Sequence, residues 1–172
     1  MWTCTPLTRP TALPTPSKSA TVATVLQLVF KLIKTKIMQP RGLRNNNPLN
    51  IRRTATQWQG LAPVQSDPDF CQFQTLEYGW RAAFRLLTRT YYARYGLDTI
   101  RKIISRWAPP TENNTTAYIA AVSQITGIPP DEPLGPPADH PARWLQLAAA
   151  MALQENGPHQ LDYLAMLRGW EK

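Results

Sequence analysis

The prolines of this chain limit the length of any regular element that it can form. They gather in three clusters, from Pro6 to Pro16, at Pro109-Pro110, and from Pro129 to Pro141. A proline lacks a backbone donor and interrupts helices and central strands, so these clusters belong to a tail and to connections. The segments between them are therefore expected to pack as short elements around one core, which a chain of 172 residues is long enough to bury.

The first cluster belongs to a segment that differs in composition from the rest. Residues 1–37 are first rich in Thr, Pro and Ser and then contain an apolar run, Ala20–Ile33, which Lys31 interrupts. A transmembrane helix needs about 20 apolar residues, and no Ala-x-Ala-like cleavage site supports the alternative of a secretory signal. We expect a disordered or weakly helical extension over 1–37 and a domain over 38–172, with Met38 as the candidate initiator.

Apolar residues recur with helical spacing between the later clusters. Strand signals are confined to 49–53 and 70–74, which could pair as a small hairpin-like element. The sequence therefore predicts a mainly α domain with a small β element. The predicted helices are Leu76–Tyr95, Asp98–Trp107, a helix that Thr111 or Asn114 caps and Gly127 ends, Ala142–Gln154, and Gln160–Arg168.

Basic residues exceed acidic ones by 19 to 11, which gives a formal charge of +8 and favours polyanionic partners. DNA, an anionic membrane surface and an anionic cell wall all fit this charge. Nucleic acid is the disfavoured partner, because no recognition-helix motif accompanies the charge. Arg81, Arg85 and Arg89 repeat on one side of the first predicted helix, either as a solvated basic face or as a binding stripe.

The stretch Arg41–Arg53 concentrates polar side chains around Pro48. Its three consecutive asparagines offer amide donors and carbonyl acceptors, and Asn-Asn-Pro favours a turn. One interpretation is a helix-capping loop. The other is a polar rim for a ligand rich in hydroxyls and amides, such as a bacterial cell-wall glycan, with Arg44, Asn45, Asn46 and Asn47 as candidate binding residues.

The same stretch resembles the opening motif of a family of phage virion and prophage proteins, Arg-Gly-Leu/Ile-Arg-Asn-Asn-Asn-Pro. The chain departs from that family at Leu49, where relatives usually have Gly, and at Gln154, where they often have His. The family is regarded as lysozyme-like, so the resemblance implies a lysozyme-like helical domain that degrades peptidoglycan. It also implies other virion proteins as partners, and the virion or the bacterial cytoplasm before lysis as location. The similarity continues through Trp58–Gly60, Asp69–Phe70, Phe73, Gly79–Ala82, Ile103–Pro109, Glu112–Asn113, Thr115, Tyr118 and Glu155–Gly157.

The sequence contains no motif typical of hydrolases that use a Ser or Cys nucleophile or a metal ion. Cys4 and Cys71 have neither metal-ligand spacing nor a disulfide pattern, and Cys71 is expected to be a small buried residue. His140 and His159 lie beside prolines, and no Ser elbow or Gly-rich phosphate loop is present. No metal or cofactor is expected, which leaves carboxyl chemistry. Cleavage of a glycosidic bond needs a carboxylic acid that protonates the leaving oxygen.

Three glutamates are candidates for this acid. Glu155 is first, because it follows an apolar helix and the C-terminus of a helix disfavours an anion. Glu77 is second, between apolar and aromatic residues at a helix start, where a first-turn acid is also favoured by the helix dipole. Glu112 is third, because a structural role would account for its presence: it could accept hydrogen bonds from backbone amides or pair with an arginine. Trp58, in a polar loop, is the aromatic residue best placed to contact a sugar.

These residues give one functional expectation and two alternatives. The expected protein is a phage enzyme that cleaves the peptidoglycan glycan strand, as a hydrolase or a lytic transglycosylase, with a Glu general acid. The first alternative keeps the fold without catalysis, as a structural or wall-binding virion component. The second is nucleic-acid binding, with arginines on phosphates and asparagines on base edges.

Overall fold

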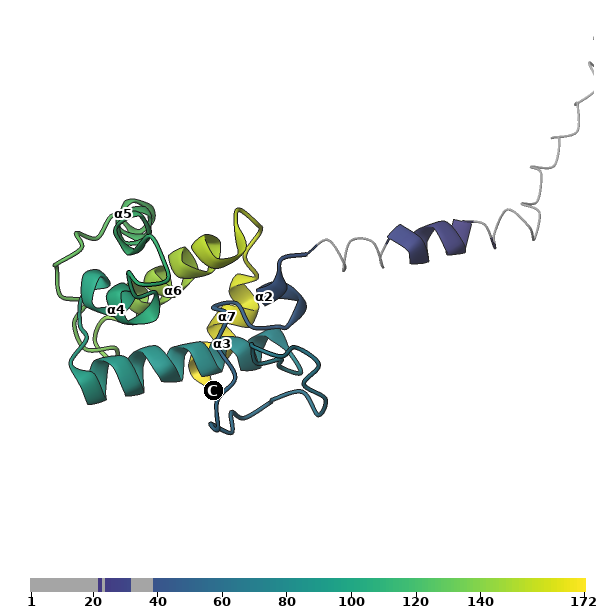
Figure 1. Ribbon diagram of the computed structural model, residues 1–172, viewed down its shortest axis with the longest axis horizontal. Helices are drawn as coiled ribbons and strands as arrows, with labels where there is room; N and C mark the ends of the chain where they lie inside the picture. The colour runs from purple at the N-terminus through teal and green to yellow at the C-terminus, as the bar shows by residue number, and fades with distance from the viewer. Residues whose placement is uncertain (1–21, 23, 32–38) are drawn as a thin grey trace, which may run out of the picture. The chain divides into compact units, whose positions relative to one another are not determined.

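The computed structural model describes residues 22, 24–31 and 39–172 (Figure 1). Most of the expected extension over 1–37 therefore lies outside the described residues. Residues 24–31 are helical, and their apolar side chains, among them Leu28 and Phe30, are exposed. No helix in the described part of the chain is long and apolar enough to cross a bilayer.

Residues Gln39–Lys172 form one compact unit built from helices. The prediction of a mainly α domain is confirmed. Within these residues the β structure is limited to two isolated antiparallel bridges, Arg52 with Phe70 and Leu61 with Phe73, so the expected hairpin is present as pairing without strands. The elements are α2 (Arg41–Arg44), α3 (Leu76–Arg85), η1 (Leu86–Arg94), α4 (Ile100–Trp107), α5 (Thr115–Thr126), α6 (Pro141–Asn156) and α7 (Tyr163–Glu171).

Side-chain caps fix the starts of three helices. Thr99 accepts a hydrogen bond from the Lys102 amide at α4, and Asn114 accepts one from the Ala117 amide at α5. Asp162 accepts one from the Ala165 amide at α7. Each cap satisfies a backbone donor that the first turn leaves without a partner. The C-terminus of α5 follows the predicted stop, because Gly127 adopts a left-handed conformation with φ of 70°.

The helix predicted over Leu76–Tyr95 changes its winding halfway. It is α-helical to Arg85, and then η1 continues it as a π-helix. The Thr88 hydroxyl donates to the Phe84 carbonyl at 2.7 Å and so competes with the regular backbone ladder at this point. The wider winding brings residues five apart onto one side, so that Leu86 and Tyr91 face the same cleft.

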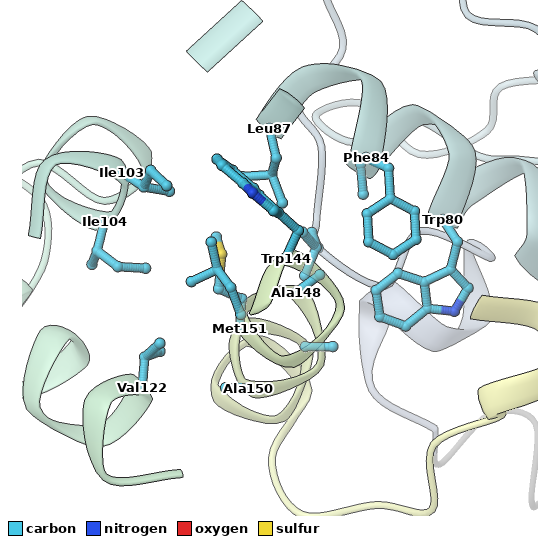
Figure 2. Close-up of a cluster of buried hydrophobic side chains, with 14 of the residues drawn as sticks. Trp80, Phe84, Leu87, Ile103, Ile104, Val122, Trp144, Ala148, Ala150 and Met151 are labelled. Carbon is cyan, nitrogen blue, oxygen red and sulfur yellow. The ribbon is translucent and has the colours of Figure 1, made fainter. Parts of the chain in front are cut away.

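Helix α6 forms the centre of the core. Figure 2 shows Trp144 and Met151 of α6 between Ile104 and Val122 on one side and Trp80 and Phe84 on the other. Trp144 and Met151 are fully buried. The alanines of α6, Ala148, Ala150 and Ala152, are also buried, and their small side chains allow neighbouring helices to pack closely. This core fixes the C-terminal end of α6, where Glu155 lies.

Candidate functional site

A cleft of about 560 Å³ opens where the loop after α2, helix η1 and the C-terminal ends of α4 and α6 meet. Its walls combine aromatic rings with amide, hydroxyl and carboxyl groups, a composition typical of small-molecule and carbohydrate sites. The lining residues are Asn50, Ile51, Arg52, Thr54, Thr56, Trp58, Phe70, Leu86, Tyr91, Trp107, Ala108, Pro109, Glu112, Asn113 and Glu155.

Glu155 lies in the last turn of α6, and three donors hold its carboxylate. One oxygen accepts from the Trp107 indole N–H at 3.1 Å and from the Tyr118 hydroxyl at 3.0 Å. The other oxygen accepts from the Asn50 side-chain amide at 3.0 Å. The donors come from the loop after α2, from α4 and from α5. Four segments that are far apart in the sequence therefore fix the orientation of one half-buried carboxyl group.

Tyr118 and Trp107 are suited to remain neutral donors. Burial, and then the charge of Glu155 and its hydrogen bond, raise the pKa of Tyr118 far above the usual range of a phenol. An indole N–H can only donate. The Trp107 ring packs edge-on against Tyr91 with their centroids 6.0 Å apart, which fixes the indole in the wall of the cleft.

The structure places two of the three candidate glutamates on this cleft. Glu112 lies at its rim with an exposed side chain, 3.7 Å from the Arg52 guanidinium, the kind of pairing expected for its structural role. Glu77 lies in the first turn of α3, outside the cleft, and accepts a hydrogen bond from Arg168 at 3.0 Å. The cleft thus holds Glu155 and Glu112 but not Glu77.

Aromatic faces line the cleft beside the carboxyl groups. Trp58 lies there, as the sequence suggested, and is half-buried against the core. Phe70 lines the cleft too, with the Arg52 guanidinium 5.6 Å from its ring centroid. Flat apolar faces next to hydrogen-bonding groups are what a sugar ring requires, because its two faces are apolar and its edge carries hydroxyls.

The three asparagines of the motif are engaged within the protein. Asn47 is fully buried, and its amide donates to the carbonyls of Ile51 and Cys71 while its oxygen accepts from the Ile51 amide. Asn46 donates to the Phe73 carbonyl at 3.0 Å. Asn45 is buried and donates to the Asp67 carboxylate at 2.7 Å. These side chains, and the exposed Arg44, are not among the residues that line the cleft.

The motif instead positions Asn50 against Glu155. Asn50 adopts a left-handed conformation with φ of 50°, which asparagine tolerates better than most residues. Gly42 lies against this turn, where a Cβ atom would collide with the side-chain oxygens of Asn50 and Asn156. Asn156 donates to the Pro48 carbonyl at 2.8 Å and so joins the motif to α6. Leu49 needs no positive φ and is a fully buried core residue.

An ion pair closes the loop that carries Phe70. The Arg41 guanidinium donates to both carboxylate oxygens of Asp67, at 2.7 and 2.6 Å, and to Asp69 at 2.8 Å. The pKa of Asp67 is lowered well below its usual range, first by the hydrogen bond from Arg41 and further by those from Asn45 and the backbone. The first arginine of the motif therefore holds the 60s loop beside the cleft.

Cys71 has the environment of a structural residue. It is buried, as expected, and that burial raises the pKa of its thiol, which disfavours the reactive thiolate. Within the described residues, no group of His, Cys, Asp or Glu side chains is arranged to hold a metal ion. The polar groups that line the cleft are carboxyl, amide, hydroxyl and indole groups and the Arg52 guanidinium.

Sequence reasoning missed the partners of Glu155. Asn50, Trp107 and Tyr118 all lie in stretches that carry the family resemblance, but the helical spacing of the two aromatics equally suits core positions. The available signal was their chemistry, because Trp and Tyr usually find a hydrogen-bond partner for their polar atoms when they are buried. Which carboxylate they would reach depends on helix packing, which the sequence pattern alone does not give.

The chain is similar to a phage protein along most of its length. It is 41% identical over 154 residues to Protein P5 of Pseudoalteromonas phage PM2, and the match covers 87% of this chain and 92% of that protein. Because 87% of 172 residues exceeds the length of Gln39–Lys172, the matched segment includes residues before Gln39. No protein-family model matches the chain.

Proposed function

The chain belongs to the family of Protein P5 of Pseudoalteromonas phage PM2. We propose that it is a virion-associated enzyme that cleaves the glycan strand of peptidoglycan. The observation that carries the proposal is the position of Glu155 in an aromatic-lined cleft, held by Asn50, Trp107 and Tyr118. A fixed carboxyl group beside flat apolar faces meets the basic requirement of glycosidic bond cleavage.

Glu155 would serve as the general acid. Its protonated carboxyl gives a proton to the glycosidic oxygen as the bond to the sugar carbon breaks. The three donors then hold the resulting carboxylate in place until it takes a proton from the attacking hydroxyl. That hydroxyl belongs to water in a hydrolase, or to the sugar itself in a lytic transglycosylase. Glu112 on the same cleft is the available second carboxyl group.

A lysozyme-like fold is part of this proposal. Its support is a mainly helical domain in which a glutamate near the end of a core helix faces a cleft. The residues placed at the cleft differ from the first expectation, because Asn50 rather than Asn45–Asn47 supplies the amide group. Trp58 and Phe70 are the proposed sugar-contacting aromatics, and the phage virion and the bacterial cell wall are the proposed sites of action.

One observation favours a non-catalytic alternative. Both oxygens of Glu155 already accept hydrogen bonds within the protein, so the carboxyl group has a structural role that requires no substrate. On this alternative the cleft binds cell-wall glycan or another virion component without cleaving it, and Glu155 serves to orient the cleft walls.

The two candidates separate in a cleavage and binding assay with purified peptidoglycan. Glu155→Gln keeps the shape of the side chain but cannot donate a carboxylic proton. We expect it to lower the release of muropeptides about a hundredfold or more, while sedimentation with intact peptidoglycan is retained. Glu112→Gln tests the second carboxyl group. Glu77→Gln, outside the cleft, is the matched control and should release muropeptides at the wild-type rate.

Folding must be compared in parallel, because Glu155 joins three segments. Coinciding circular dichroism spectra and thermal melts would show that each variant is intact. A folded Glu155→Gln protein with full activity would remove Glu155 as the acid. A wild type that sediments with peptidoglycan but releases no muropeptides would establish the binding alternative.

A further inference from the structure

A second pocket, of about 550 Å³, lies between three segments of the same domain. The α3–η1 helix forms one wall, the Pro-rich connection before α6 forms another, and the end of α7 forms the third. It shares no lining residue with the cleft around Glu155. The function proposed for that cleft therefore does not explain the residues that line this second pocket.

Three arginines dominate this pocket, and no acidic residue lines it. They are Arg81, Arg85 and Arg89, which repeat every four residues along the α3–η1 helix and are called the arginine stripe below. Among the described residues Arg81 and Arg89 form no ion pair, whereas Arg41 and Arg101 each pair with a carboxylate. The stripe therefore brings three positive charges to one pocket, and two of them, on Arg81 and Arg89, have no carboxylate partner among the described residues.

The hydrogen-bonding groups of the stripe are also incompletely used. The Nε atom of Arg81 is buried and has no hydrogen-bond partner in the described part of the chain. The Arg85 guanidinium donates to the main-chain oxygen of Lys172 at 3.0 Å. A buried donor without an acceptor costs free energy, so the protein alone does not satisfy all the hydrogen-bonding groups of the stripe.

The charges also act on one another. Burial, and then the neighbouring positive charges of Arg89 and Arg81, lower the pKa of Arg85. An arginine still stays protonated, so the repulsion remains until a negative charge enters the pocket. Arg81 and Arg85 are offset by about 6 Å along α3, which suits an anion with several oxygens better than a single carboxylate.

The rest of the pocket is apolar and aromatic. Tyr92 and Trp170 contribute rings, and Pro137 and Pro141 contribute the opposite apolar wall. The Trp170 ring packs edge-on against Phe84, with centroids 5.0 Å apart, so its position is fixed by the core. A ligand that fills the pocket would place an apolar part against these rings and its anionic group on the arginines.

We propose that this pocket binds the phosphate group of a phosphate ester. The planar guanidinium fork matches phosphate oxygens in pairs, and this explains why the stripe consists of arginines rather than lysines. The phosphate comes either from a soluble phosphate compound or from a lipid headgroup, since both present the same oxygens to the arginines.

Binding of inorganic tripolyphosphate and of phosphatidylglycerol vesicles tests the site in the full-length protein. Arg89→Gln removes an exposed guanidinium that has no described partner, and we expect it to weaken binding about tenfold. Arg85→Lys keeps the charge but loses the fork, and should also weaken binding. The control is Arg94→Gln, an exposed arginine of the same helix outside the pocket, which removes the same charge.

Each outcome decides the proposal. Tripolyphosphate binding that falls in Arg89→Gln but not in Arg94→Gln supports a site for soluble phosphate compounds. Vesicle binding with the same pattern supports a headgroup site. If wild-type protein binds neither probe, or if both Gln variants weaken binding equally, the pocket is not a phosphate site. Thermal melts of the three variants ensure that any loss of binding arises in folded protein.

Discussion

Asp67 accepts hydrogen bonds from the Arg41 guanidinium, the Asn45 amide and the backbone amides of Asp69 and Phe70. All of these favour the charged carboxylate, and the pKa of Asp67 is therefore lowered in the folded protein. A carboxyl group with a lowered pKa stabilises the fold above its unfolded pKa of about 4, and this stabilisation is lost as the pH falls through the folded pKa.

The first prediction concerns the pH dependence of this residue. We expect Asp67→Asn to lower the melting temperature most at pH 6 to 7, and the difference from wild type to shrink as the pH falls below about 4. Melts recorded between pH 2 and pH 7 measure this difference. Asp139→Asn, at an exposed carboxyl group of the loop before α6, is the control. A difference that stays constant with pH would contradict the assigned role of the Asp67 charge.

Local sequence context predicted some residues of the cleft, but it could not separate structural side chains from ligand-binding ones. Glu155 and Trp58 were singled out by local context, and both lie on the cleft. Asn47 was indistinguishable from a ligand-binding amide, because its partner Cys71 is 24 positions away. A side chain that caps a loop and one that faces a ligand carry the same groups, so only the tertiary contacts separate them.

At the scale of elements, helix α7 packs on α3 through Gly169. A Cβ atom at this position would lie 2.5 Å from the Cβ atom of Trp80 and 2.8 Å from the Glu77 carbonyl oxygen. The close approach seats Trp170 against Phe84 and so forms one wall of the arginine pocket. The glycine is thus required by packing rather than by helix formation, which alanine favours more.

The second prediction follows from this contact. Gly169→Ala should destabilise the domain by about 1–3 kcal/mol, because overpacking outweighs the gain in helix propensity of about 1 kcal/mol. Denaturant unfolding measures the free energy of unfolding. Leu167→Ala, at an exposed position of the same helix, is the control and should change it by less than about 0.5 kcal/mol. Equal stabilities of Gly169→Ala and wild type would show that α7 can shift away at no cost.

The longer helices were predictable from apolar spacing, caps and stops, as α5 illustrates with Asn114 and Gly127, whereas the short helix α2 was not predicted. The π-helix η1 was not, because Leu87 and Tyr91 also fit the spacing of an ordinary helix. The Arg52–Phe70 bridge joins the two stretches predicted as strands, 49–53 and 70–74, but Leu61, which pairs with Phe73, lies outside both. Alternation in 70–74 does not reveal how few residues pair. Periodicity gives the buried face of an element, whereas its winding and its partners depend on packing.

At the scale of the whole molecule, the third prediction concerns the boundary at Met38. Gln39–Lys172 is a compact unit with its own core, so a protein that begins at Met38 should melt within about 2 °C of the full-length chain. A much lower melting temperature would show that the upstream residues stabilise the domain. Because the similarity to Protein P5 extends upstream of Gln39, the peptidoglycan and phosphate assays should be repeated with the shortened protein.

The last prediction concerns the net charge of +8. If long-range attraction brings the protein to an anionic cell wall, sedimentation with purified wall should fall as salt rises from 0.05 to 1 M, because the screening length shrinks to about 3 Å. Glu155→Gln should follow the same salt curve, since the attraction arises from the whole surface and not from the cleft. Wall binding that does not change with salt would assign binding to short-range contacts, such as those of Trp58 and Phe70. Tight, length-dependent DNA binding at physiological salt without wall binding would instead establish a nucleic-acid partner.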